Sequence, residues 1–252
     1  MKRAIPILLI FCALLAIVSG FFLPSFVSAM QDQKLKTKVN TYETSSLQFH
    51  PVVQLKDSLR LLTGEYTTEF LENGSNLDAD GAYQAALDTM QFMAAQGAAG
   101  ILSEECADHT ETPFLVVSAD KTMSAIMWRC ALYSKSFNKW IDILIDDSSG
   151  KMLAFNMISD QAVIDAQSTK DAKEQANKFF SKLADICSNY YGWKTENVQI
   201  NGVLTKDNLS DYSIKGSIKM RDDGGDLVVF PLTISGDQYT FNTLLRFRGI
   251  IS

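Results

Sequence analysis

The strongest constraint on the fold of this chain is a regular alternation of side chains over Trp140–Asp146, where isoleucine occupies every second position. Side chains two positions apart project from the same face of a strand, so the isoleucines form one buried face. The polar turn Asp147–Gly150 follows, and Asp, Ser and Gly are residues that close short hairpin loops. Apolar alternation resumes over Lys151–Ile158. The sequence therefore predicts a hairpin and, around it, a domain that contains an antiparallel sheet.

A helix followed by four strand-like runs is predicted twice along the chain. The first helix, Gly81–Gln96, has apolar residues at helical spacing, and Asp78 or Asp80 can cap its start. The second helix begins with a pair that resembles a capping box, Asp171 and Glu174, and ends at a glycine. The predicted strands are Pro113–Ala119, Met123–Ser134, Asn138–Asp146 and Lys151–Ile158, then Asn197–Leu204, Leu209–Arg221, Asp226–Ser235 and Gln238–Phe247.

This order of elements predicts an α+β protein with two consecutive units, each a helix packed on a four-stranded antiparallel meander. The units span 76–160 and 161–252, and their sheets can lie side by side or form one continuous sheet. Before them, residues 30–75 are expected to form a polar tether and a short helix. In that helix a proline precedes leucines at helical spacing.

The N-terminal segment 1–29 is expected to direct export. Lys2 and Arg3 precede an almost uninterrupted apolar run, Ala4–Phe22, and a Val-Ser-Ala sequence follows that ends at Ala29. Cleavage after Ala29 fits a signal peptide, and an uncleaved membrane anchor within residues 4–28 is the alternative. The basic start places the remainder outside the cytoplasm in both cases. We therefore expect a protein that is secreted or anchored at the membrane.

The charge of the chain argues against nucleic-acid binding. The net charge is −6, whereas nucleic-acid binding needs a basic face. The sequence also has no glycine-rich loop of the kind that holds phosphates or dinucleotides. We expect no nucleic-acid partner and no cofactor.

The exported part of the chain holds three cysteines, Cys106, Cys130 and Cys187. An odd number allows at most one bridge within the chain, and the sequence alone does not give its connectivity. Cys187 lies on the apolar face of the second predicted helix, where a free cysteine packs as a small hydrophobic side chain. Cys106 and Cys130 are therefore the candidate disulfide.

One segment resembles half of a calcium-binding loop. Asn76, Asp78 and Asp80 supply oxygens at alternate positions, and Gly81 follows at the sixth position. The twelfth position is Leu87, where such loops carry a bidentate glutamate. Helix capping explains the aspartates without a metal, so we expect no metal site here.

No set of residues with a catalytic spacing is evident. Cys106 and His109 lie in an acidic loop without the second ligand pair that zinc needs, and a thiol nucleophile would need a base whose position the sequence does not give. The acidic residues Asp142, Asp146 and Asp147 lie beside a predicted turn, where Asp serves turn hydrogen bonding. We therefore assign no catalytic residue.

The hairpin over Trp140–Phe155 resembles the terminal hairpin of PepSY-type domains, and the helix start Thr169–Ala176 resembles the alanine-rich helix of such modules. Cystatin-like folds have similar hairpins. The resemblance implies a non-catalytic extracytoplasmic module of Gram-positive bacteria, associated with peptidases as an inhibitor or with membrane sensors as a regulator.

The leading hypothesis from the sequence is an exported cell-envelope protein that acts through contact with an envelope or membrane protein. The first alternative is a hydrolase that uses Asp142 and Asp146, or Cys106. The second is a module that binds a small ligand or glycan through Trp128 or Trp140, because exposed aromatic side chains can line such sites.

Overall fold

The computed structural model describes residues 54–98, 106–134, 139–158, 164, 166, 168–205, 212–236 and 238–242, all within the compact unit Phe49–Ser252. The predicted export segment and the first part of the predicted tether lie outside these residues. Within the described ranges, no helix is long and apolar enough to cross a membrane.

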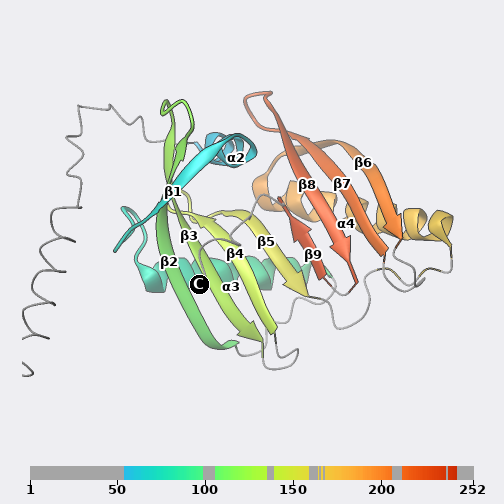
Figure 1. Cartoon of the computed structure of the whole chain (residues 1–252), viewed down its shortest axis with the longest axis horizontal. Helices are drawn as coiled ribbons and strands as arrows, with labels where there is room; N and C mark the ends of the chain where they lie inside the picture. The colour runs from blue at the N-terminus through green and yellow to red at the C-terminus, as the bar shows by residue number, and fades with distance from the viewer. Residues whose placement is uncertain are drawn as a thin grey trace, which may run out of the picture. The chain divides into compact units, whose positions relative to one another are not determined.

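The described chain forms helices on one nine-stranded antiparallel sheet (Figure 1). The strand order is β1-β2-β3-β4-β5-β9-β8-β7-β6, which confirms the α+β class. The element bounds are α2 (Leu55–Thr63), β1 (Tyr66–Phe70), α3 (Ala79–Ala95), β2 (Cys106–Ser118), β3 (Ser124–Ser134), β4 (Lys139–Asp146), β5 (Met152–Ile158), α4 (Thr169–Tyr191), β6 (Lys194–Thr205), β7 (Tyr212–Arg221), β8 (Leu227–Ser235) and β9 (Gln238–Phe241).

The prediction of two units with four-stranded meanders is not confirmed. β1 forms before α3 and pairs with β2, so the first half of the sheet has a fifth strand. β9 pairs with β5, with Phe155 opposite Phe241, and this ladder joins the two halves into one sheet. The joining has a physical reason, because each meander would otherwise end in an edge strand with unpaired backbone groups.

Stacked aromatic rings fill the junction between the halves. The rings of Phe155 and Phe241 stack at 5.2 Å between centroids, and Phe241 stacks on Phe230 of β8 at 4.7 Å. All three side chains are fully buried, and burial of such a side chain contributes about 1.5–3 kcal/mol. The junction is therefore part of the hydrophobic core.

Helices α3 and α4 cover the same face of the sheet, which we call the helix face (Figure 1). The thiol of Cys130 on β3 donates to the Ala82 carbonyl of α3, and a Cβ atom at Gly216 on β7 would lie 2.5 Å from the Phe180 ring of α4. One row of cross-strand partners connects these two contacts. The row is Cys130, Ile143, Phe155, Phe241, Leu232 and Gly216.

Local capping follows the sequence closely, with one correction. The Asp78 side chain accepts a hydrogen bond from the Gly81 amide at 2.8 Å, which confirms the predicted cap of α3. The cap of α4 is Ser168, whose hydroxyl accepts from the Asp171 amide at 3.2 Å, so Asp171 lies inside the helix. Gly192 ends α4 with a φ of 74°, a conformation that glycine adopts at low cost.

The opposite face of the sheet, which we call the open face, carries α2. Ser58 of α2 donates to Asp146, and Asp146 lies opposite Met127 on β3. Met127 is an odd number of positions from Cys130, so its side chain projects away from the helix face. Three leucines of α2 are also buried, namely Leu59, Leu61 and Leu62. The short helix is therefore part of the core.

Candidate functional site

The turn after β4 holds a polar cluster built on two buried aspartates, Asp146 and Asp147. Asp147 is 2% exposed, and its Oδ2 atom accepts from the Ser75 amide at 3.1 Å and from the Asn76 amide and side chain at 2.9 and 3.0 Å. Its Oδ1 atom accepts from the Leu77 amide at 3.2 Å and from the Trp128 indole at 2.8 Å. Asp147 therefore joins a distant loop to the hairpin.

Asp146 makes a second set of contacts on the open face. It is 1% exposed, and its Oδ1 atom accepts from the Ser58 hydroxyl of α2 at 2.8 Å. Its Oδ2 atom accepts from the hydroxyls of Ser148 and Ser149 at 2.6 Å and from the Ser149 amide at 3.0 Å. The two neighbouring aspartates thus connect the turn to both sides of the sheet.

Hydrogen bonding keeps Asp147 ionised although it is buried. Burial alone raises the pKa of this carboxyl, but the hydrogen bonds from Trp128, Leu77 and Asn76 outweigh it and hold the pKa below the ordinary value. A carboxylate that is already bonded to five donors has little capacity left to accept a proton from a substrate. The cluster is built to fix structure.

A pocket of about 190 Å³ adjoins this cluster. Its lining residues are Ser75, Asn76, Leu115, Ser124, Ala125, Ile126, Asp146, Asp147 and Ser148. The volume is below the range of about 300–1,000 Å³ of ordinary small-molecule sites, and the polar lining can hold ordered water. The sequence predicts a strand end and a turn for Asp146 and Asp147, and the structure adds their long-range contacts with Ser58 and Trp128.

The three calcium candidates serve other roles in the structure. The Asn76 side chain donates to Asp147, Asp78 caps α3, and Asp80 lies in the first turn of that helix. Among the residues that the structure describes, no group of three or more His, Cys, Asp or Glu side chains could hold a metal ion.

The candidate disulfide is not formed in this register. Cys130 is a free, buried thiol, and the Cα atom of Cys106 lies opposite Ser134. Ser134 is four positions from Cys130 along β3, about 13 Å, whereas a disulfide needs Cα atoms within about 7 Å. Cys187 is buried on α4, as its apolar position predicted.

The remaining catalytic candidates lie apart. Asp142 is paired with Arg129, with a contact of 2.6 Å between a guanidinium nitrogen and Oδ1, and it is four positions from Asp146 on the same strand. The Nδ1–H of His109 donates to the Glu111 carboxylate at 2.9 Å, and the imidazole ring stacks on Tyr83 of α3. The structure therefore does not bring Asp142 and Asp146, the two aspartates of the predicted hydrolase, into one site.

The three tryptophans divide between core and surface. Trp128 is 2% exposed, and its indole is held by Asp147. Trp193 is also buried and stacks on Tyr191. Trp140 is 47% exposed on the open face, so it is the only one of the three that a partner can contact.

Trp140 belongs to a group on β3 and β4 that we call the aromatic patch, made of Arg129, Tyr133, Trp140 and Asp142. Tyr133 is the cross-strand partner of Trp140, with ring centroids 5.4 Å apart. The Arg129–Asp142 pair lies beside them on the same face. Tyr133 and Arg129 were not predicted from the sequence as members of a site. The alternation that buries the isoleucines of β4 places Trp140 and Asp142 on the opposite face. This alternation is the sequence signal that could have located the patch.

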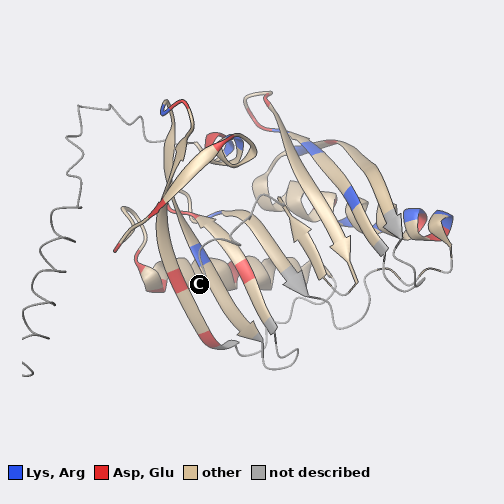
Figure 2. Cartoon of the chain, viewed as in Figure 1, with Lys and Arg blue, Asp and Glu red and all other residues tan. Residues whose placement is uncertain are grey.

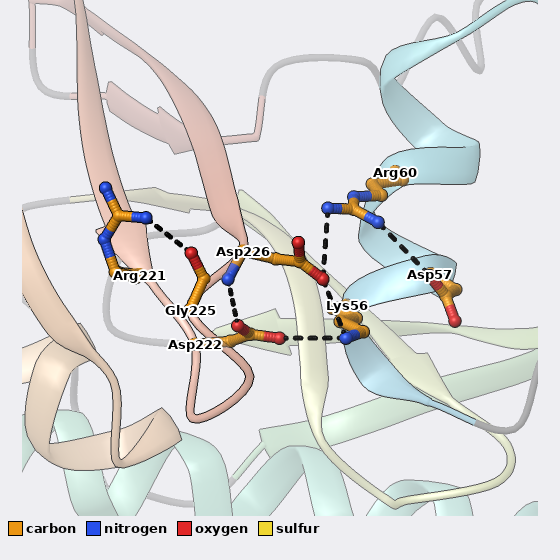
Figure 3. A network of polar contacts seen from close by, with 7 residues as sticks. All are labelled: Lys56, Asp57, Arg60, Arg221, Asp222, Gly225 and Asp226. Carbon is orange, nitrogen blue, oxygen red and sulfur yellow. Dashed lines mark hydrogen bonds and ion pairs between the residues drawn. The ribbon is translucent and has the colours of Figure 1, made fainter.

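A network of ion pairs fixes α2 to the turn between β7 and β8 (Figure 3). Lys56 contacts Asp222 at 3.3 Å and Asp226 at 2.9 Å, and Arg60 contacts Asp226 at 3.5 Å. The hydrogen bonds and charges of the two aspartates raise the pKa of Lys56, and the contact with Lys56 lowers the pKa of Asp226. Because Ser58 of the same helix bonds Asp146, α2 is attached to both halves of the sheet.

No family model, no curated protein and no solved structure matches this chain. The resemblance to PepSY-type modules therefore stays a prediction from two short segments.

Proposed function

We propose that this chain is an exported, non-catalytic module that binds a partner protein at the cell envelope through the open face of its sheet. The observation that carries the proposal is the aromatic patch, with Trp140 47% exposed beside Tyr133. Tryptophan, tyrosine and arginine are the residues most enriched where protein–protein binding energy concentrates. This patch presents all three types together.

The chemistry of the patch suits protein recognition better than catalysis. Trp140 and Tyr133 offer apolar area with little side-chain entropy to lose on binding, and the Arg129–Asp142 pair presents charge in a fixed geometry. By contrast, the buried carboxylates of Asp146 and Asp147 are committed to structural donors. The export segment predicted from 1–29 supports a partner outside the cytoplasm.

Photo-crosslinking in cells tests the proposal. A benzoylphenylalanine residue replaces Trp140 in the full chain, and the matched control carries it at Asn177, which is exposed on α4. We expect a discrete protein adduct from position 140 and none from position 177. The proposal fails if the exported protein gives no adduct from position 140, or if both positions capture the same proteins.

A further inference from the structure

The open face of β6 and β7 gathers basic side chains, although the chain has a net charge of −6. The group, which we call the basic patch, is Lys194, Lys215, Lys219 and Arg221. Lys194 lies opposite Arg221, and Lys215, Lys219 and Arg221 share one face of β7 because they alternate with buried residues of the helix face. Figure 2 shows basic residues along β7 and acidic residues at the turn that follows it.

The positive charge of this patch is largely uncompensated. Glu196 is the acidic residue within it, and its bond to Arg221, followed by the charges of Arg221, Lys194 and Lys219, lowers its pKa. One carboxylate among four cations leaves three positive charges in excess. Within the described part of the chain, Lys194, Lys215 and Lys219 make no ion pair.

The acidic turn next to the patch compensates only part of its charge, because the charges of Asp222 and Asp226 act on Arg221. Asp222 and Asp226 are engaged by Lys56 and Arg60 of α2 (Figure 3). Asp223 of the same turn is exposed and adds a further negative charge. The excess positive charge of the patch is therefore that of Lys194 on β6 and of Lys215 and Lys219, which lie farther from the turn along β7 than Arg221.

The patch also offers apolar and uncharged polar contacts. Leu227 and Val229 of β8 lie opposite Arg221 and Lys219 and are 42% and 38% exposed. On the other side of β7, Asn197 lies opposite Lys219 and is exposed. Charge, apolar area and amide groups thus alternate over a distance that a polypeptide segment can span.

We infer that the basic patch binds an acidic, partly apolar segment of the partner protein. The inference rests on the proposed function, because it takes the partner to be a protein. Positive and negative surfaces attract at an interface and select the partner. A polypeptide is favoured over an anionic lipid surface, because the exposed amide of Asn197 offers directional hydrogen bonds that a peptide backbone matches.

Fluorescence polarisation with a synthetic probe tests the inference. The probe is a labelled peptide of alternating glutamate and valine, as long as the 12-residue strand β6. The double variant K215E/K219E reverses two charges of the patch, and K173E/K178E makes the same charge change on the exposed surface of α4. We expect the first variant to weaken binding by about tenfold or more and the second to leave it nearly unchanged.

Two further experiments test whether something other than a peptide binds the basic patch. Sedimentation with vesicles of phosphatidylglycerol and phosphatidylcholine tests a lipid surface, and analytical ultracentrifugation tests a second copy of the chain. The inference is overturned if the peptide does not bind, if both variants weaken it equally, or if K215E/K219E abolishes vesicle binding or self-association instead. Crosslinking from Trp140 is a separate measurement. If the peptide experiment fails but the crosslink forms, the proposed function stands, and the partner is recognised by a surface other than the basic patch.

Discussion

Replacing Asp147 by asparagine tests whether the buried turn holds the fold together. The substitution keeps the shape of the side chain but turns one carboxylate oxygen into an amide that donates. Oδ1 receives two hydrogen bonds, from Leu77 and Trp128, and Oδ2 receives three, from Ser75 and Asn76. The NH2 group of the asparagine can take the place of either oxygen. It costs least in the place of Oδ1, because only two buried donors then lose their acceptor.

The magnitude follows from those two donors. Each unsatisfied buried donor costs about 1–3 kcal/mol, so Asp147→Asn should lower the free energy of unfolding by about 3 kcal/mol. Two donors together span about 2–6 kcal/mol. The neighbouring pocket of about 190 Å³ can admit water to one of them, which keeps the total in the lower half of that range. A loss of this size is a large share of the about 5–15 kcal/mol that stabilises a typical domain.

Urea unfolding at several pH values measures this loss, with Asp223→Asn in the exposed β7–β8 turn as the matched control. The folded pKa of Asp147 lies below the ordinary 3.8. The ionised form therefore stabilises the folded state fully at pH values above the ordinary pKa of 3.8. This contribution is lost as the pH falls through the folded pKa. The difference between wild type and Asp147→Asn should thus stay constant from pH 7 to about 5 and shrink below about 4.

Two results would refute the reasoning about Asp147. A loss below about 1 kcal/mol at neutral pH would mean that the donors find other acceptors. A penalty that stays the same down to pH 3 would mean that the ionised carboxylate is not what stabilises the turn. The Asp223 control should change stability by less than about 0.5 kcal/mol at any of these pH values.

Three further changes test the packing around the sheet. Gly216→Ala places a Cβ atom 2.5 Å from the Phe180 ring and should lower the free energy of unfolding in urea by about 2 kcal/mol. In the control Gly202→Ala, the added Cβ atom meets nothing within 4 Å, so stability should hardly change. Equal effects of the two substitutions would contradict the close approach of α4 to β7. Thr240→Val removes a buried hydroxyl that has no hydrogen-bond partner among the described residues and should stabilise by about 1 kcal/mol. A clear loss of stability in thermal melting would count against this burial. Burial raises the pKa of the Cys130 thiol to about 12, so a thiol reagent at neutral pH should modify it only in urea, and rapid labelling of the native protein would show that the site is open.

Local chemistry made the hairpin and the helices predictable. The alternation in Trp140–Asp146 gives β4 its buried face, and the polar turn gives the reversal. The alanines and methionines of α3 pack on the sheet as their spacing predicted. The α4 cap was misassigned by three positions, because Ser168 and Asp171 are both acceptable capping residues and only the backbone geometry selects between them.

Contacts between distant segments could not be obtained in the same way. The Asp147–Asn76 bond joins residues 71 positions apart, and the β5–β9 ladder joins two edges whose pairing no local pattern specifies. One signal was present nonetheless. Trp128 lies on the same face of β3 as Cys130, and a buried indole N–H usually needs an acceptor, so a buried carboxylate near that end of the strand was a reasonable expectation.

The contacts of α2 make it part of the folded domain that contains the sheet. A boundary before Asn76 would separate α2 and β1 from the sheet, yet the three leucines of α2 are buried and together contribute about 6 kcal/mol. Ser58 bonds Asp146 in the first half of the sheet, while Lys56 pairs with Asp222 and Asp226 in the second. A short helix with attachments in both halves restrains their relative movement. The aromatic patch and the basic patch lie one in each half, so α2 also fixes the spacing that a single partner would have to match.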